Sequence, residues 1–467
     1  MKVKGLLYTL GIISLLYSLA IFNTGCAQIG APTGGPRDTI PPKLLKASPG
    51  LNTVNFRGNK ITLTFDEYVE VQDVQNNVLV SPLPKVNPVV DYKLKTVTVK
   101  LKDSLLPNTT YSINFGKAIR DNNEANPLKN FTYVFSTGNT IDSLTFTGKV
   151  IIAETGKADS TLFAMLYRNA DDSAVKKRRP DYLAKLNGDG SFTFNNLSAG
   201  TYKIYALKDG DGGRTYNSKT ELFAFADAPV KIAETTTPVT LYASAEEKDS
   251  RNLTTTLLST KAAPIIKKLL YTSPAITQGQ GLNDNFELIF NKPLKKFDAA
   301  KLKLTDTAYK LISSVTANID STRKKIIFSV KWQEDMGYRL IIDPAAIADS
   351  LGTSIAKTDT IRFTTKKISD YGNLVLRFSD LDLTRHPVLQ FVQGEELKES
   401  SPITANEWSK KLFPPGEYDI RILFDTNNNG KWDAGNYSKK IQPEKVIALP
   451  QRLSIRANWD NERDIKL

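Results

Sequence analysis

An internal repeat constrains the fold of this 467-residue chain more than any other feature of its sequence. The segment Lys43–Pro49 (KLLKASP) recurs as Lys268–Pro274 (KLLYTSP), and Ile61–Phe65 recurs as Phe286–Phe290, both after 225 residues. Two further anchors follow in the same order after 228 residues: Ile119–Asp121 with Ile347–Asp349, and Phe135–Thr137 with Phe363–Thr365. Because four anchors keep their order and nearly their spacing, the sequence predicts two copies of one structural unit.

The segment that follows each copy is also repeated. Gly200–Asp209 (GTYKIYALKD) matches Gly416–Asp425 (GEYDIRILFD) after 216 residues. Two apolar pairs keep the same shift: Phe192 with Trp408, and Leu197 with Phe413. The sequence therefore predicts four modules in the order A–B–A′–B′. Their predicted boundaries are 38–138 (A), 139–246 (B), 263–367 (A′) and 368–467 (B′), with a polar linker over 247–262.

The local pattern of the modules is that of β-strands. Apolar and polar residues alternate in Lys60–Phe65, Thr96–Leu101, Tyr111–Phe115 and Phe131–Phe135, and turn-forming residues separate these runs. A period of two is typical of half-buried strands in an antiparallel sandwich. No long segment has helical periodicity, although short helical turns are expected near 343–349. The predicted fold class is all-β, with tandem β-sandwich modules.

Motifs in the two kinds of module resemble known domains. The A module resembles the SbsA-type bacterial Ig-like domain in five places: Pro41-Pro42, Ser48-Pro49, Leu63–Glu67, Asn108–Tyr111 and Tyr133–Thr137. The A′ module departs from it, because Phe290-Asn291-Lys292 lacks the acids. The B module resembles prealbumin-like or carboxypeptidase-regulatory sandwiches through Gly190–Phe194 and Leu197–Tyr202. These resemblances imply a cell-envelope protein of Ig-like fold, without any implied chemistry.

The N-terminus has the pattern of an exported protein. Lys2 and Lys4 precede the apolar stretch Leu6–Phe22, which favours a signal peptide over 1–25, although a transmembrane anchor or plain secretion remains an alternative. The only cysteine, Cys26, follows directly, and the site resembles the lipobox of bacterial lipoproteins, with Asn23 where Leu is usual. The resemblance implies acylation of Cys26, with 26–37 as a Gly- and Pro-rich tether.

The same resemblance implies a lipid-anchored protein of the outer membrane. No acidic cluster follows Cys26, which favours the periplasmic face over the cell surface. The net charge of +13 comes from scattered basic residues, so it indicates attraction to an anionic envelope rather than binding of nucleic acid.

Composition excludes several kinds of catalytic site. One His and one Cys cannot build a Cys/His zinc site, a disulfide framework or a thiol redox pair. The single histidine, His386, lies in a predicted loop without a nucleophile to activate. Asp66 and Glu67 follow a predicted strand, and neighbours in extended chain point to opposite faces, so the two side chains cannot flank one bond and are expected at an exposed strand end. We therefore expect no enzymatic activity.

One segment of B′ resembles the first part of a calcium loop. Its oxygen ligands would be Asp425, Asn427, Asn429, Asp433 and the carbonyl of Lys431, with Gly430 at the sixth position. Position 12 is Asn436 rather than the usual Glu, so strong binding needs a carboxylate from elsewhere. The alternative is a plain hairpin turn at Asn429-Gly430. For the equivalent segment of B, Asp209–Arg214, we predict only a turn.

A second pattern is spread along the chain. Asp followed by Ser or Thr and then an apolar residue or Thr resembles an O-glycosylation signal of some Gram-negative bacteria. The candidate acceptors are Thr39, Ser104, Ser143, Ser160, Ser173, Thr307, Ser321, Ser350 and Thr360. The alternative is that Asp-Ser and Asp-Thr simply favour turns. The basic run Lys176–Pro180 leaves a similar choice between an anionic ligand and a solvated loop.

Together these features predict a non-enzymatic, lipid-anchored scaffold or binding protein of the cell envelope. Calcium is the only cofactor that the sequence suggests. The expected partners are outer-membrane lipid and envelope glycans or proteins. The alternatives are an accessory protein or enzyme of envelope glycan processing, and a calcium-stiffened surface adhesin.

Overall fold

The protein is represented by a computed structural model that describes residues 11–14, 37–248 and 269–467. The predicted signal peptide, apart from residues 11–14, lies outside the described residues, as do Cys26, nearly all of the tether and most of the linker. Within the described part, no helix has the length and apolar character needed to cross a membrane. The chain divides into two compact units, of which one holds module A and the other holds modules B, A′ and B′.

Module A is built from short antiparallel strands. They are β1 (Leu44–Ser48), β2 (Lys60–Phe65), β3 (Val69–Val71), β4 (Leu79–Ser81), β5 (Val89–Lys93), β6 (Thr96–Lys100), β7 (Thr110–Asn114), β8 (Ile119–Asp121) and β9 (Thr132–Ser136), with the short helix α2 (Val74–Asn77). Three sheets form, in the orders β1-β2-β6-β5, β3-β8 and β4-β7-β9. The alternation seen in the sequence is explained by burial, because Ile61, Leu63 and Phe65 are all fully buried in the core.

Module A′ has the same strand order. Its elements are β18 (Tyr271–Thr272), α4 (Ala275–Gln278), β19 (Phe286–Phe290), β20 (Leu294–Phe297), η2 (Ala299–Lys301), β21 (Leu302–Asp306), β22 (Val315–Ile319), β23 (Lys325–Val330), β24 (Gly337–Ile342), η3 (Pro344–Ala346), β25 (Ile347–Asp349) and β26 (Asp359–Thr364). The sheets β18-β19-β23-β22, β20-β25 and β21-β24-β26 correspond one by one to those of module A. The helical turn expected near 343–349 is the 3-10 turn η3.

Module B has a different topology that includes one parallel pair. Its elements are β10 (Leu144–Ile152), β11 (Phe163–Arg168), α3 (Ala174–Lys177), β12 (Tyr182–Lys185), β13 (Ser191–Leu197), β14 (Gly200–Leu207), β15 (Phe223–Phe225), β16 (Val230–Ile232) and β17 (Val239–Ala243). One sheet has the order β13-β10-β17, in which β10 and β17 are parallel. The other has the order β12-β11-β14-β15, with β16 also paired to β14.

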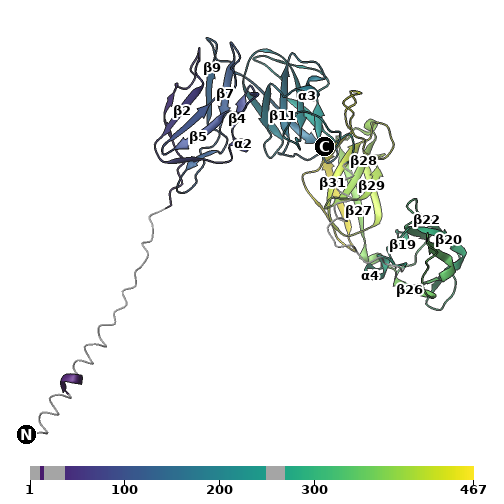
Figure 1. Ribbon diagram of the computed structural model, residues 1–467. Coiled ribbons are helices and arrows are strands. Elements are labelled where there is room, and N and C mark those ends of the chain that lie inside the picture. The colour runs from purple at the N-terminus through teal and green to yellow at the C-terminus, as the bar shows by residue number, and fades with distance from the viewer. Residues whose placement is uncertain (1–10, 15–36, 249–268) are drawn as a thin grey trace, which may run out of the picture. The chain divides into compact units, whose positions relative to one another are not determined.

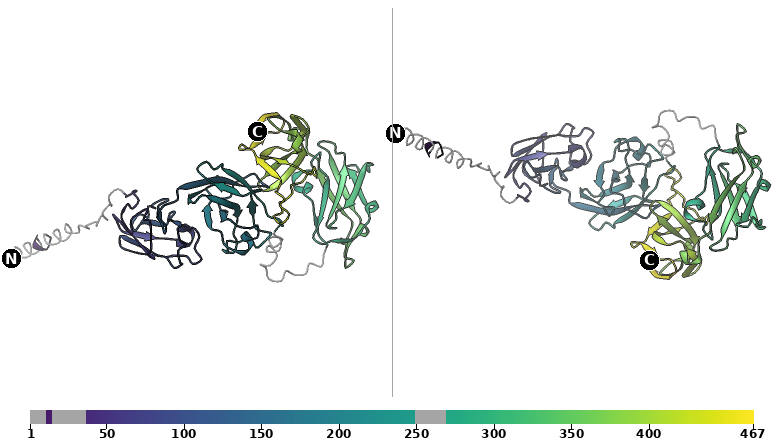
Figure 2. Two further views of the ribbon diagram at one scale, coloured as in Figure 1. Left: turned by 90° about the horizontal axis from the view of Figure 1, so that it is seen from above. Right: turned by 90° about the horizontal axis from the view of Figure 1, so that it is seen from below.

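Module B′ repeats this topology. Its elements are η4 (Ile368–Asp370), β27 (Gly372–Ser379), η5 (Leu383–Arg385), β28 (Pro387–Gln393), β29 (Glu396–Pro402), β30 (Glu407–Phe413), β31 (Gly416–Phe424), β32 (Lys445–Ala448), β33 (Leu453–Ile455) and β34 (Asp460–Lys466). The sheet β30-β27-β34 again contains a parallel pair, and β29-β28-β31-β32 again has an extra strand, β33, on β31. The described chain is thus an all-β protein of tandem β-sandwiches, which can be followed by colour in Figure 1 and from above and below in Figure 2.

The repeat predicts that equivalent core positions make equal contributions to stability. Leu63 and Leu288 lie at matching positions of β2 and β19, and both are fully buried. Leu63→Ala and Leu288→Ala should each destabilise their own module by about 2–5 kcal/mol, because each leaves a cavity. Hydrogen exchange on the full chain in detergent would show faster exchange in the affected module only.

The control for this prediction is Thr62→Ala, which changes the neighbouring, partly exposed side chain on the opposite face of β2. It should cost less than about 1 kcal/mol. If Leu288→Ala disturbs exchange no more than this control, then β19 does not have the core role that the repeat assigns to it.

Candidate functional site

The most elaborate contact between modules in the described chain is made by Tyr437. This residue lies in the loop 425–444, which joins β31 to β32 of module B′. Its ring enters an aromatic cluster of module B, with ring centroids 5.1 Å from Phe223, 5.2 Å from Phe225 and 5.8 Å from Tyr205. The rings meet edge to face, which is the favourable geometry for aromatic pairs. Only 4% of Tyr437 is exposed, so modules B and B′ dock directly on each other.

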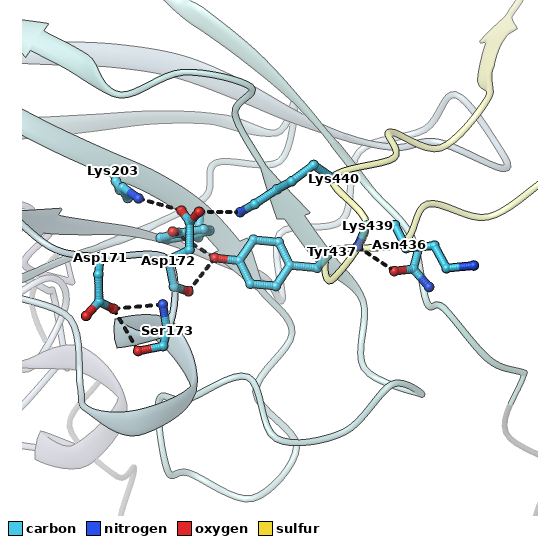
Figure 3. Close-up of polar contacts among 9 residues, drawn as sticks. Asp171, Asp172, Ser173, Lys203, Asn436, Tyr437, Lys439 and Lys440 are labelled. Carbon is cyan, nitrogen blue, oxygen red and sulfur yellow. Dashed lines mark hydrogen bonds and ion pairs between the residues drawn. The ribbon is translucent and has the colours of Figure 1, made fainter.

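The hydroxyl of Tyr437 is fully hydrogen-bonded inside this cluster. It donates to the backbone carbonyl of Asp172 at 2.6 Å, as Figure 3 shows. It lies 3.0 Å from the hydroxyl of Tyr205 and must accept there, because its single proton is already used. Burial raises the pKa of Tyr437, and burial also raises the pKa of Tyr205. Both phenols therefore stay protonated and can donate at neutral pH.

Charged side chains surround the buried hydroxyl. Asp172 accepts from Lys203 of module B and forms an ion pair with Lys440 of module B′ at 3.2 Å (Figure 3). These contacts, led by the one from Lys203, lower the pKa of Asp172, so the carboxylate is ionised at neutral pH. The ammonium of Lys440 also lies 4.0 Å from the centroid of the Tyr437 ring. Lys203 of module B and Lys440 of module B′ thus both hold Asp172, the residue whose carbonyl binds the Tyr437 hydroxyl.

The docked modules also cover each other's sheet edges. The N–H of Val446 on β32 donates to the carbonyl of Ala153 at 3.1 Å, and the side chain of Gln442 donates to the carbonyl of Phe225 on β15 at 3.0 Å. Gly156 has a φ of +67°, and a Cβ there would lie 2.6 Å from the backbone nitrogen of Ala448. Only glycine allows this approach. Two edge strands, which would otherwise offer unpaired backbone groups, are covered as a result.

Sequence reasoning did not find this interface. Tyr437 sits in a polar stretch, where a single aromatic residue has no periodic neighbours to mark it as buried. Lys176, from the basic run that we assigned to an anionic ligand or a solvated loop, lies over the rings of Tyr437 and Tyr216 at 5.6 and 5.7 Å. The only available signal was the unusual length of the two equivalent loops that follow β14 and β31.

The predicted calcium loop occupies the first part of the same B′ loop. Asp425 is fully buried, and its carboxylate accepts from the backbone N–H groups of Asn429 at 3.2 Å and Gly430 at 2.6 Å. The side-chain amides of Asn427 and Asn429 both donate to Oδ2 of Asp433, at 2.6 and 2.7 Å. Three of the four predicted ligand residues therefore meet, through the NH₂ groups of the two asparagines, while the asparagine oxygens accept from the backbone N–H groups of Asn429 and Lys431. Asp425 fixes the backbone of the same turn.

A residue outside the motif supplies a further carboxylate. Glu444 is 5% exposed and accepts from the N–H of Thr426 at 2.7 Å and from the N–H of Asp433 at 3.0 Å. It therefore clamps the two ends of the motif together, in a region where the sequence pattern required a carboxylate from elsewhere. The two-residue hairpin at Asn429-Gly430 is not formed, because β31 ends at Phe424 and β32 begins only at Lys445.

The equivalent loop of module B is more than the plain turn that we predicted. Carboxylate oxygens of Asp209, Asp211 and Glu221 lie within 4.8 Å of one another, so this acidic triad could bind a metal ion. The sequence pattern missed it because Glu221 lies outside the motif. Asp209 is also paired with Arg214 at 3.1 Å, so a cation would compete with a guanidinium. The N–H of Gly213 donates to Asp211 and lowers the pKa of that carboxyl.

The other candidate residues lie apart from the interface. His386 is exposed at the end of η5. Asp66 accepts from the N–H of Lys43 at 2.8 Å, and burial, followed by the charge of Asp121, raises the pKa of Glu67. Of the nine candidate glycosylation residues, Ser173 and Thr360 are partly buried and the other seven are exposed.

Several aspartates of the glycosylation pattern cap turns in the structure. The carboxylates of Asp38, Asp159, Asp306 and Asp349 each accept from the backbone N–H two residues ahead. This contact is the Asx turn, which accounts for the recurrence of Asp before Ser or Thr without any modification. Glycosylation of the exposed hydroxyls stays a prediction.

The comparisons with known proteins identify the first module. Residues 38–137 match the family model described as a bacterial Ig-like domain. Module A is a bacterial Ig-like domain. The match confirms the Ig-like resemblance for this segment, whereas the prealbumin-like resemblance of the B modules stays a prediction. A search of curated proteins finds no match.

Solved structures also resemble the chain. The N-terminal part of the bacterial S-layer protein SbsC is 14% identical, with a TM-score of 0.16, and the alignment covers 42% of each chain. The major pilin subunit BcpA of Bacillus cereus is 10% identical, with a TM-score of 0.16, over 70% of this chain and 99% of that one. Native alpha-2-macroglobulin from Escherichia coli, over domains MG0-NIE-MG1, is 12% identical with a TM-score of 0.20, over 39% and 72%.

The docked interface predicts a specific chemical cross-link. A carbodiimide joins an amine to a carboxylate in contact with it, and Lys157 lies 3.0 Å from Asp419 across the interface. Wild-type full-length chain should yield this cross-link. In Tyr437→Ala its yield should fall severalfold, because removing a buried aromatic side chain costs about 3–5 kcal/mol. Mass spectrometry of the digested protein would measure the yield.

Tyr437→Phe should have an intermediate effect, since it keeps the ring but leaves a buried carbonyl and hydroxyl without their partner, at about 1–3 kcal/mol. The control is Tyr92→Ala, which removes a tyrosine that is 50% exposed. An undiminished Lys157–Asp419 cross-link in Tyr437→Ala would show that the aromatic cluster does not hold the modules together.

Proposed function

We propose that this chain is a non-enzymatic, lipid-anchored scaffold of the bacterial outer membrane. The observation that carries the proposal is the docking of B′ on B through Tyr437. Long loops at the ends of β-sandwiches are the usual place for binding or catalytic residues. Here the long loop of B′ and its equivalent in B pack against each other, since the hydroxyl of Tyr216 and the backbone N–H of Tyr437 both donate to the carboxylate of Glu246 at 3.0 Å.

A scaffold gains from such a contact because it fixes the spacing of two modules that are far apart in the sequence. The docked modules bury an aromatic cluster, which opposes separation of the modules. They also cover two strand edges, which prevents edge-to-edge association with other chains. The bacterial Ig-like domain of module A supports an extracytoplasmic location, as does the predicted signal peptide. We further propose that the exported protein faces the periplasm, a choice that protease treatment of intact cells would test.

The lipid anchor predicts how the protein partitions between membrane and soluble fractions. Cys26→Ala removes the only thiol that can be acylated. The variant should move from the detergent phase to the aqueous phase, because stable membrane attachment needs its acyl chains. Metabolic labelling with a fatty-acid analogue should mark the wild-type chain and leave the variant unlabelled.

A matched variant tests the unusual residue in the motif. Asn23→Leu restores the residue that is usual at this position, so labelling should be kept or increased. If Cys26→Ala stays in the detergent phase, residues 6–22 are a retained transmembrane anchor instead, and the lipoprotein proposal is wrong.

We also infer that the Asp425 loop binds calcium. The bound ion would stiffen the loop that docks module B′ on module B. The favouring observation is the convergence of Asn427 and Asn429 on Asp433. A side-chain amide carries an oxygen as well as an NH₂ group, so turning each amide over would replace a donor with a hard oxygen ligand. Binding of the ion would have to offset the loss of the hydrogen bonds that these oxygens accept from the N–H groups of Asn429 and Lys431. The buried Asp425 holds the backbone in the required turn without the ion.

Calcium should therefore raise the melting temperature of the full chain at millimolar concentration, through linkage. With the position-12 Glu absent, we expect a dissociation constant on the order of 10⁻⁴–10⁻³ M. Asp433→Asn keeps a hydrogen-bond acceptor but removes the charge, so it should abolish the rise. Asp425→Ala is a poorer test, because two backbone N–H groups would lose their acceptor and the loop would weaken by about 1–3 kcal/mol without calcium.

Asp211→Asn is the matched control, since it alters the acidic triad of module B. It should leave the calcium response intact if the Asp425 loop is the site. A response that is lost in Asp211→Asn and kept in Asp433→Asn would move the site to module B. A melting temperature that calcium does not change would reject both sites.

A further inference from the structure

The outer face of the five-stranded sheet of B′ carries a row of polar side chains. Strand β28 is buried on both faces, with Leu389 and Phe391 in the core of the module. Gln390 points to the other face, opposite Ser400 on β29 and Arg421 on β31. Because directly opposed residues of antiparallel strands share a face, these three side chains lie side by side.

One member of this row has a buried polar atom without a partner. The Nε–H of Arg421 is buried and finds no acceptor among the described residues. Gln390, beside it, is only 7% exposed. Native proteins pair nearly all buried N–H groups, so this unpaired guanidinium N–H marks a position where a ligand could bind.

These groups face a cavity of a size suited to a small ligand. Its volume is about 380 Å³, and it is lined by the polar row together with Lys431 and Trp432 of the calcium-like loop. Pockets for small molecules begin at roughly 300 Å³. The indole N–H of Trp432 donates to the carbonyl of Glu444 at 2.8 Å, so the tryptophan contributes a wall rather than a donor.

The charges in the cavity favour an anion at Arg421. Two acids, Glu154 and Glu395, also line the cavity. Glu154 lies 3.8 Å from Lys248, and neither acid forms an ion pair with Arg421 in the described chain. The guanidinium of Arg421 thus has no ion pair among the described residues, and its buried Nε–H has no acceptor there. A guanidinium with a free Nε–H can bind a carboxylate through two parallel hydrogen bonds.

We propose that this cavity, which residues of B′ line together with Glu154 and Lys248, binds a small carboxylate-bearing ligand. Arg421 holds the carboxylate, and Gln390 and Ser400 bond to neighbouring oxygen or nitrogen atoms. The carboxylate could belong to an acidic sugar or to the end of a short peptide, and both sources share this chemistry. The cavity shares Lys431 with the proposed calcium loop, but Arg421, Gln390 and Ser400 belong neither to that loop nor to the Tyr437 contacts.

Four probes distinguish the sources of the carboxylate. Glucuronate and N-acetylalanine carry it, whereas glucose and the amide of N-acetylalanine are their neutral counterparts. Ligand-observed NMR with the full chain in detergent should show binding of one or both acids and of neither neutral probe. Preference for glucuronate identifies an acidic sugar as the source, and preference for N-acetylalanine identifies a peptide end. Absence of binding by both acids up to tens of millimolar would overturn the proposal.

Variants of Arg421 test its role directly. Arg421→Gln should weaken binding of the acid by about tenfold or more, as expected for the loss of a charge-assisted hydrogen bond. Arg421→Lys should weaken it as well, because lysine keeps the charge but lacks the paired donors. Arg377→Gln is the matched control, since Arg377 lies outside the cavity and is already paired with Glu462. It should leave binding unchanged.

A stability measurement separates binding from a structural role. Because the buried Nε–H has no partner, Arg421→Met should leave the melting temperature of the ligand-free protein unchanged or raise it. A lowered melting temperature in Arg421→Met would show that the guanidinium serves the fold, and would overturn the proposal. So would undiminished binding of the acid by Arg421→Gln.

Discussion

Burial of the Tyr437 ring in module B is the interaction on which the arrangement of the two B-type modules depends. A single aromatic side chain with a hydrogen-bonded hydroxyl gives both apolar burial and a fixed orientation, because the carbonyl of Asp172 and the hydroxyl of Tyr205 must be met together. The other contacts across this interface that we have described are exposed ion pairs and single hydrogen bonds, which individually contribute less. The aromatic cluster therefore determines that B′ docks on B, and the polar contacts adjust the relative position of the two modules.

The loop that carries Tyr437 also carries the calcium-like motif, so the two features are linked physically. Asp425 and Glu444 are buried carboxylates that hold the first part of the loop through backbone N–H groups. Rigidity at this end reduces the entropy lost when the distal part docks on module B. An ion bound among Asn427, Asn429 and Asp433 would stiffen the same segment further. The calcium-like motif and the Tyr437 interface thus act together to fix the position of module B′ on module B.

The same loop forms a wall of the cavity at Arg421, which has a different character. Every polar group of the Tyr437 interface that we have described has a partner, whereas the row at Arg421 leaves one buried donor, the Nε–H of Arg421, unpaired. Unpaired buried groups lower stability and persist where a ligand completes them. The Tyr437 interface is therefore a contact within the protein, whereas the cavity at Arg421 is the surface that we propose for a ligand.

Sequence alone determined the repeated strand order, because alternation of apolar residues and repeated turn anchors are local features that burial of one sheet face imposes. It also located the calcium-like loop, since oxygen side chains at alternate positions around Gly430 are a pattern of adjacent residues. It could not determine which distant groups meet. Glu444, at the end of the loop, folds back onto its beginning. Glu221 joins Asp209 and Asp211, and Gln390 aligns with Arg421 only through strand register. These contacts, and the docking of Tyr437, join residues far apart in the chain, so only the tertiary structure could decide them.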